Sequence, residues 1–132
     1  MIEIVVVGAH LTGLPLNHEL VSEGGVLRRA ALTEPCYRLY ALAGGPPRRP
    51  GLLRVAAGSG AAIATEVWAL PDDGFGRFVS RIPAPLGIGT LLLADGSSPK
   101  GFLVEPEGLQ GAEDITRFGG WRAFLASIAT PA

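Results

Sequence analysis

One histidine in this chain lies in a loop that is suited to chemistry. His10 belongs to the run Gly8-Ala9-His10-Leu11-Thr12-Gly13-Leu14-Pro15-Leu16-Asn17, which directly follows an apolar stretch at residues 2–7. Two glycines and a proline interrupt strands and helices, so we expect a tight loop here. Backbone amides converge in such loops and bind anions. The run predicts the floor of a small-molecule site, and the alternative is an ordinary strand-to-helix turn with an exposed histidine.

Four further polar residues are candidates for the same site. Arg38 and Tyr40 alternate with apolar residues in the run 37–42 and therefore share one face of a predicted strand. Glu66 has small and apolar neighbours on its face of a predicted strand at 61–70, where a carboxylate needs a partner or a cavity. We expect Arg38 to pair with Glu66, in a structural or a functional ion pair, unless Arg38 is simply solvated. Asn17 adds an amide at the end of the loop.

Several common kinds of active site are absent from the sequence. It has no Gly-x-Gly-x-x-Gly opening a helix, no Walker loop and no Gly-x-Ser-x-Gly elbow. His10 and His18 are too far apart in sequence to form a two-histidine metal face on one helix. Cys36 is the single cysteine, which excludes an internal disulfide and a cysteine metal centre. We expect neither a metal nor a cofactor.

Strands and short helices alternate around these residues. The β-branched run from Ile2 to Val7 predicts a central strand that is buried on both faces. A short helix is expected to end at Gly24-Gly25, and Asp72-Asp73 are expected to open another. Residues 85–89 predict a Gly/Pro loop, followed by a hairpin of strands at 90–93 and 100–104. The apolar spacing at 121–128 predicts a terminal amphipathic helix.

These elements predict a single domain over residues 1–132. Strands dominate and hairpins are frequent, while the helices are short. The fold class is therefore α+β, and a small mixed β-barrel with flanking short helices is the most economical arrangement.

The composition limits the classes of partner. The net charge is −1 with 17% charged residues, so no basic field attracts nucleic acid or an anionic membrane. No apolar run is long enough to cross a bilayer, and no signal-like segment opens the chain. Because 48% of the residues are hydrophobic, we expect a well-filled core, a pocket, or a face covered by another subunit, such as a homodimer partner. The cytoplasm is the expected compartment.

Seven segments of the sequence resemble one known family. They are the loop at 8–17, Tyr-Arg-Leu-Tyr-Ala-Leu (37–42), Glu-Val-Trp-Ala-Leu-Pro (66–71), Gly-Arg-Phe-Val (76–79), Ile-Pro-Ala-Pro-Leu-Gly-Ile-Gly (82–89), Lys-Gly-Phe-Leu (100–103) and Phe-Gly-Gly-Trp-Arg (118–122). Together they resemble the C-terminal domain of allophanate hydrolase over nearly the whole chain. The resemblance implies a fold like that of γ-glutamyl cyclotransferase. The amidase domain that precedes this domain in the family is not among these 132 residues, so we expect a free-standing or excised version of the domain.

The resemblance also implies a role in urea breakdown. In the family an amidase cleaves allophanate, and this domain is thought to decarboxylate the resulting N-carboxycarbamate to carbamate and carbon dioxide. His10 matches the histidine of the family's loop and is the predicted catalytic residue, acting as a general acid. From the residues themselves we expect that the small anionic substrate is bound by the remaining candidates: Leu11, Thr12, Gly13, Asn17, Arg38, Tyr40 and Glu66.

Two other functions stay open. The first is a γ-glutamyl cyclotransferase-like activity, although residues 72–83 lack the glutamate that such enzymes use and only Glu66 offers a substitute. The second is a non-catalytic module that assembles with an amidase-family protein or stabilises it, which would explain the high apolar content.

Overall fold

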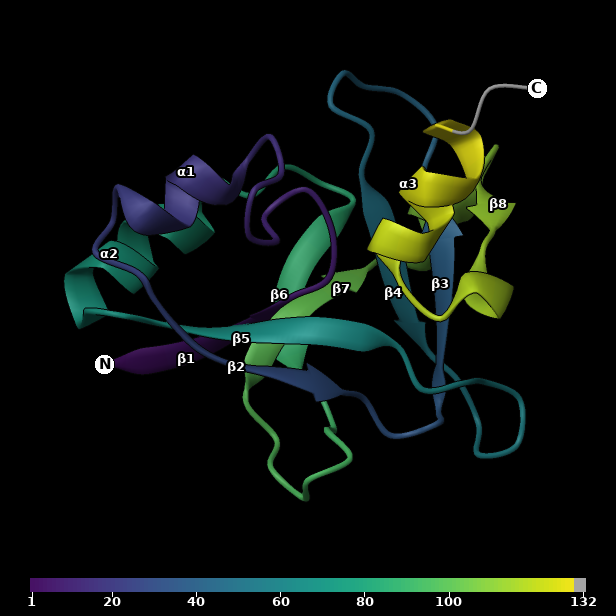
Figure 1. Cartoon of the computed structure of the whole chain (residues 1–132), viewed down its shortest axis with the longest axis horizontal. Helices are drawn as coiled ribbons and strands as arrows, with labels where there is room; N and C mark the ends of the chain where they lie inside the picture. Colours follow the sequence, from purple (N-terminus) through teal and green to yellow (C-terminus); the bar gives the residue numbers. More distant parts are fainter. Residues whose placement is uncertain (130–132) are drawn as a thin grey trace.

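The computed structural model describes residues 1–129, which form two open β-sheets and short helices (Figure 1). The strands are β1 (Ile2–Val6), β2 (Val26–Leu32), β3 (Tyr37–Ala41), β4 (Pro50–Arg54), β5 (Ala64–Leu70), β6 (Leu86–Thr90), β7 (Lys100–Val104) and β8 (Glu113–Asp114). One sheet has the order β2-β5-β1-β7-β6 and the other β4-β3-β8. The α+β class is confirmed. The predicted barrel is wrong, because β2 and β6 remain separate edges of the larger sheet.

The first strand lies in the middle of the larger sheet, as its β-branched sequence predicts. β1 pairs antiparallel with β5 and parallel with β7. Ile4, Val5 and Val6 are fully buried, so both faces of β1 pack against other elements. Burial of such side chains stabilises the fold by about 1.5–3 kcal/mol each. The loop that follows β1 therefore starts from a rigid point.

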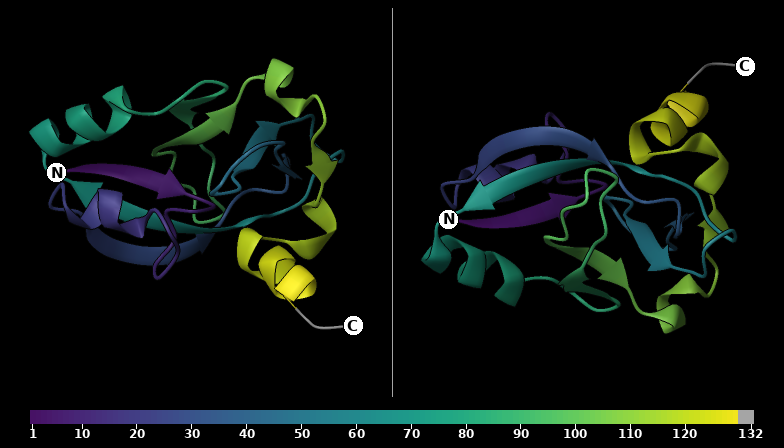
Figure 2. Two further views of the ribbon diagram at one scale, coloured as in Figure 1. Left: turned by 90° about the horizontal axis from the view of Figure 1, so that it is seen from above. Right: turned by 90° about the horizontal axis from the view of Figure 1, so that it is seen from below.

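The helices cover two ends of the molecule. They are α1 (Asn17–Val21), α2 (Asp72–Ser80) and α3 (Trp121–Ala129), with 3₁₀ turns η1 (Pro106–Leu109) and η2 (Thr116–Phe118). Figures 1 and 2 show α1 and α2 at one end of the larger sheet and α3 at the opposite end, beside the smaller sheet. Asp72 and Asp73 lie in the first turn of α2, as predicted. The terminal helix is confirmed as well, and it buries Trp121 and Phe124 but leaves Ile128 exposed.

The predicted loop at residues 85–89 is wrong, because most of it is strand β6. β6 pairs with β7 in a hairpin, in which Gly89 lies opposite Gly101. A side chain at Gly89 would collide with Leu103, and one at Gly101 would collide with Leu91 and Val5. The glycines therefore permit close packing within the sheet rather than a flexible turn.

One close contact joins the loop after β1 to the smaller sheet. Gly8 packs so tightly against the Pro50 ring that a β-carbon at position 8 would overlap it. Pro50 opens β4, and Arg49 directly precedes it. The absence of a side chain at Gly8 therefore allows the His10 loop and Arg49 to approach each other.

This packing predicts that Gly8→Ala destabilises the protein by about 1–3 kcal/mol, because the rigid proline ring must move to admit the methyl group. The free energy of unfolding in urea measures the effect. Gly76→Ala in α2 is the matched control, since a β-carbon there meets open space. It should leave stability unchanged or raise it by up to about 1 kcal/mol. Equal stability of Gly8→Ala and the wild type would contradict the close contact.

Candidate functional site

The His10 side chain is held on three sides. Its Nε2 lies 2.7 Å from Oε1 of Glu19, which α1 supplies. The imidazole stacks on the Phe102 ring of β7 at 5.1 Å and meets the edge of the Phe78 ring of α2 at 5.2 Å between centroids. Only 9% of the side chain is exposed. The alternative of an exposed histidine in a simple turn is therefore wrong.

Burial and charge act in opposite directions on this imidazole. Burial lowers the pKa of His10 below its usual value, and the positive charge of Arg49 adds to that effect. The hydrogen bond and the negative charge of Glu19 oppose it without reversing it. When neutral His10 donates Nε2–H to Glu19, the second nitrogen, Nδ1, has no proton. The pair therefore supplies a positioned group that can exchange a proton.

Asn17 holds the loop rather than facing a ligand. Its side-chain amide donates to the carbonyl oxygen of His10 at 2.8 Å. Asn17 is also the first residue of α1, the helix that carries Glu19. The contact thus fixes His10 relative to the carboxylate that binds it.

Two small cavities are lined by His10, and a larger cleft shares Arg49 with both of them. The first cavity, of about 20 Å³, is lined by Val7, Gly8, Ala9, His10, Arg49, Pro50, Leu86 and Phe102. The second, also of about 20 Å³, is lined by His10, Glu19, Arg49, Phe78, Arg81, Ile82 and Pro83. The outer cleft, of about 340 Å³, is lined by Leu42, residues 43–47, Arg49 and residues 83–86. Each small cavity has room for about one water molecule, whereas the outer cleft has room for a small metabolite.

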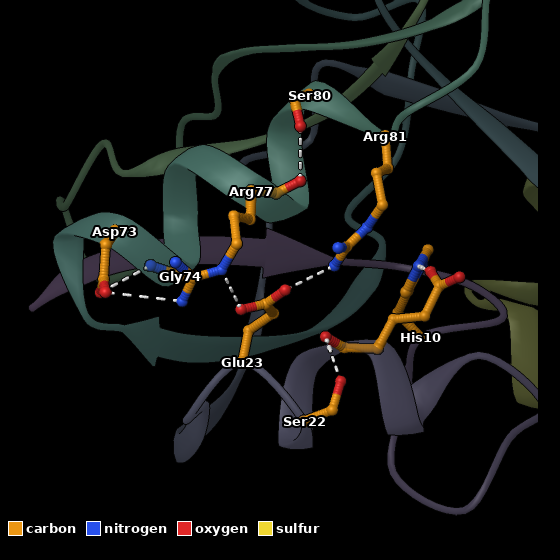
Figure 3. A network of polar contacts seen from close by, with 9 residues as sticks. His10, Ser22, Glu23, Asp73, Gly74, Arg77, Ser80 and Arg81 are labelled. Atoms are coloured by element: carbon orange, nitrogen blue, oxygen red, sulfur yellow. Dashed lines mark hydrogen bonds and ion pairs between the residues drawn. The ribbon is translucent and has the colours of Figure 1, made fainter.

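Arg81 brings a second guanidinium to the cavity beside Glu19, but that charge is already paired. Glu23 accepts hydrogen bonds from Nη2 of Arg81 at 2.7 Å and from Nε of Arg77 at 2.8 Å. Figure 3 shows Glu23 between the two arginines, with His10 on the far side of Arg81. Hydrogen bonds from Arg77 and Arg81 lower the pKa of Glu23, so it remains a carboxylate.

Arg38 and Tyr40 do not lie beside His10. Arg38 binds Asp114 of β8 through Nε and Nη2, both at 2.8 Å, and donates to the Ser59 carbonyl oxygen at 3.0 Å. The predicted pairing of Arg38 with Glu66 is wrong, because β3 and β5 belong to different sheets. Tyr40 lies on the same strand as Arg38, opposite Asp114. Neither Arg38 nor Tyr40 lines the two His10 cavities or the outer cleft.

Glu66 anchors the other side of the loop. Its Oε1 accepts hydrogen bonds from the amide and hydroxyl of Thr12, both at 2.9 Å, and from the Trp68 indole at 3.1 Å. Oε2 lies 3.4 Å from Arg122. Burial raises the pKa of Glu66, but these donors outweigh it and hold the pKa below its usual value. Glu66 is therefore already satisfied by the protein.

Two backbone amides of the loop already have hydrogen-bond partners within the protein. Leu11 N–H donates to the Gly8 carbonyl oxygen, and Thr12 N–H donates to Glu66. Leu11 and Glu66 line a separate groove of about 330 Å³ beside α3. Gly13 is exposed at a left-handed φ of 80°. Of the predicted site residues, the structure brings His10 and Asn17 together and leaves the others outside the His10 cavities.

Three neighbours of His10 were missed from the sequence. Glu19 lies on the predicted short helix, so its place next to the loop was a usable signal. Phe78 and Phe102 lie in two of the segments that carry the family resemblance, but nothing in the sequence places their rings next to His10. Within residues 1–129 no group of three histidine, cysteine, aspartate or glutamate side chains could hold a metal ion. No helix in that range is long and apolar enough to cross a membrane.

Comparisons with known proteins identify close relatives. The family model for the allophanate hydrolase C-terminal domain matches residues 2–126. Urea amidolyase of Saccharomyces cerevisiae is 42% identical over 130 residues, which are 96% of this chain and 7% of the yeast protein. The chain thus spans a small part of that relative's length.

Solved structures agree in fold. Allophanate hydrolase of Kluyveromyces lactis has a TM-score of 0.93 and 42% identity, over 96% of this chain and 21% of that one. A uropathogenic E. coli-specific protein has a TM-score of 0.87 and 35% identity, over 95% of both chains. A mouse AIG2-like protein, at 19% identity and a TM-score of 0.60 over 83% of this chain and 82% of its own, supports the predicted γ-glutamyl cyclotransferase-like fold alone. The chain belongs to the allophanate hydrolase C-terminal domain family.

Proposed function

We propose that this domain decarboxylates N-carboxycarbamate to carbamate and carbon dioxide in cytoplasmic urea breakdown, after an amidase has cleaved allophanate. The family membership supports the pathway. The observation that carries the reaction is the buried His10 imidazole, which is paired with Glu19 and packed against two phenylalanine rings. Its two small cavities share Arg49 with a cleft that is large enough for a small acid. The domain needs no cofactor in this scheme.

The reaction requires one proton. In N-carboxycarbamate, a nitrogen bears two carboxylates, and loss of carbon dioxide breaks one carbon–nitrogen bond. The bonding electron pair stays on the nitrogen, which then takes a proton to become the amino group of carbamate. The His10 imidazolium donates that proton, while Glu19 stabilises the positive charge before transfer. The rings of Phe78 and Phe102 exclude water and strengthen these charge interactions.

A non-catalytic role has its own supporting observation. Val21 of α1 and three residues of the edge strand β2, Val26, Leu27 and Leu32, are between 44% and 55% exposed. Such apolar residues suit contact with another protein, and the yeast relative is far longer than this chain. Light scattering of the domain, alone and with an amidase-family partner, tests assembly. A strict monomer that never co-migrates with the amidase would count against it.

The cyclotransferase alternative finds less support. α2 holds no glutamate, and its sequence from Asp72 to Ser80 offers only two aspartates in the first turn. Glu66, the remaining candidate, is bound by Thr12, Trp68 and Arg122 outside the His10 cavities. Formation of pyroglutamate from γ-glutamyl dipeptides would revive this alternative.

His10→Asn should abolish the acceleration of carbon dioxide release when the domain is mixed with an allophanate-cleaving amidase. The expected loss is about 10²–10⁴-fold, the usual contribution of a positioned acid. Stopped-flow detection of carbon dioxide, with ammonia release recorded in parallel, separates this step from the amidase step. His18→Asn is the control, since His18 is exposed and should leave the rate unchanged. Undiminished release with His10→Asn would exclude His10 as the acid.

The pKa of His10 should lie below 6.5, and Glu19→Gln should lower it further. The wild-type shift follows from burial, and the variant removes the carboxylate that partly counteracts it. Because the imidazolium is the acid, the decarboxylation rate should fall as pH rises through this pKa, and the fall should begin at lower pH in Glu19→Gln. Nuclear magnetic resonance titration of the imidazole gives the pKa. A His10 pKa that is unchanged or raised in Glu19→Gln would contradict the pairing.

A further inference from the structure

Arg49 is partly buried and has no carboxylate partner among residues 1–129. Among the described residues, six arginines form ion pairs: Arg29, Arg38, Arg77, Arg81, Arg117 and Arg122. Three that do not, Arg28, Arg48 and Arg54, are exposed to solvent. Arg49 alone in residues 1–129 is partly buried and still lacks such a partner. A cation removed from water without a counter-charge favours binding of an anion.

Arg49 is also the residue that links the His10 cavities to the outer cleft. It lines both small cavities together with His10, and it lines the outer cleft, which His10 itself does not line. No other residue is shared by all three spaces. A molecule in the outer cleft can therefore contact the same arginine that lines the cavities of the imidazole.

The other charges near His10 are already compensated. Glu23 binds Arg81, and His10 binds Glu19. The positive charge of Arg49 is felt at the imidazole, where it lowers the pKa of His10. Arg49 thus supplies the uncompensated positive charge of this site, whereas Arg38, the arginine predicted from the sequence to bind the substrate, is paired with Asp114.

We propose that Arg49 determines specificity at this site by binding one carboxylate of a small dicarboxylate, which places the rest of the molecule against His10. The proposal rests on the proposed decarboxylation, because a dianion with one atom between its carboxylates is the substrate of that reaction. A guanidinium binds a carboxylate through two parallel hydrogen bonds and so fixes its orientation. A neutral diamide of the same size gains no such interaction and is rejected.

Malonate is the probe, because it replaces the nitrogen of N-carboxycarbamate with a stable methylene group. Isothermal titration calorimetry on the whole chain should show malonate binding that Arg49→Gln weakens on the order of 10–100-fold. Arg49→Lys keeps the charge without the two-pronged geometry, so its affinity should fall between those of the wild type and Arg49→Gln. Malonamide should not bind the wild type.

Arg48→Gln is the matched control. Arg48 is the exposed neighbour of Arg49 and stacks over the Phe124 ring, 5.4 Å from its centroid. The variant changes the net charge equally and should keep wild-type affinity. Thermal unfolding of each variant shows that the fold persists, and if Arg49→Gln does not fold, Arg49→Lys alone decides the comparison with Arg48→Gln.

The outcomes separate this proposal from the proposed function. Equal malonate affinity in the wild type, Arg49→Gln and Arg49→Lys would overturn the role of Arg49, and so would an absence of binding to the wild type. If Arg48→Gln weakens malonate binding as much as Arg49→Gln does, the effect is one of net charge, and the specific role of Arg49 is overturned too. If Arg49→Gln loses malonate binding but the wild type does not accelerate carbon dioxide release, the anion site is supported and the proposed decarboxylation is wrong.

Discussion

The burial of one imidazole against one carboxylate is the interaction on which this structure depends most. His10 lies between two phenylalanine rings, where desolvation favours the neutral ring, while Glu19 favours the charged one. Neither the phenylalanine rings nor Glu19 would by itself give an imidazole that is both desolvated and fixed in orientation. An imidazole without Glu19 would have no fixed orientation, and one without the rings would be solvated. The balance gives an imidazole whose protonation depends on the charges nearby.

The rest of the fold keeps that pair in position. β1, buried on both faces, fixes the start of the His10 loop, and Glu66 fixes the loop from the opposite side through Thr12. The contact of Gly8 with Pro50 brings the smaller sheet close, and Arg49 arrives with it. The geometry around His10 is a result of how the two sheets meet, rather than of either sheet alone.

The sequence predicted the local elements better than their pairing. The apolar runs and the acidic helix start at Asp72 identified β1 and α2 because those signals lie within a few residues. Closure into a barrel depends on which distant strands pair, and no local pattern contains that information. Arg38 and Glu66 lie on strands of different sheets, and Arg38 pairs with Asp114 of β8 instead of Glu66.

The candidate site, too, could be predicted only where its residues carry a local sequence signal. His10 stood out as a histidine in a glycine-bounded loop, and it lies in the site. Arg49 gave no signal, because it follows a Gly/Pro-rich segment without periodicity, and only the docking of Pro50 on Gly8 brings it to His10. Leu86 lies in the predicted loop at 85–89 and Phe102 in the predicted strand at 100–104, and neither segment indicates that both residues line the first cavity.

A crystal structure of the chain grown with malonate tests most directly whether a small dianion binds between a guanidinium and the buried imidazole. We expect one carboxylate on the Arg49 guanidinium, in the outer cleft, with the other end of the molecule directed at His10. Malonate bound only elsewhere, or an Arg49 guanidinium turned away from both His10 and the ligand, would contradict it.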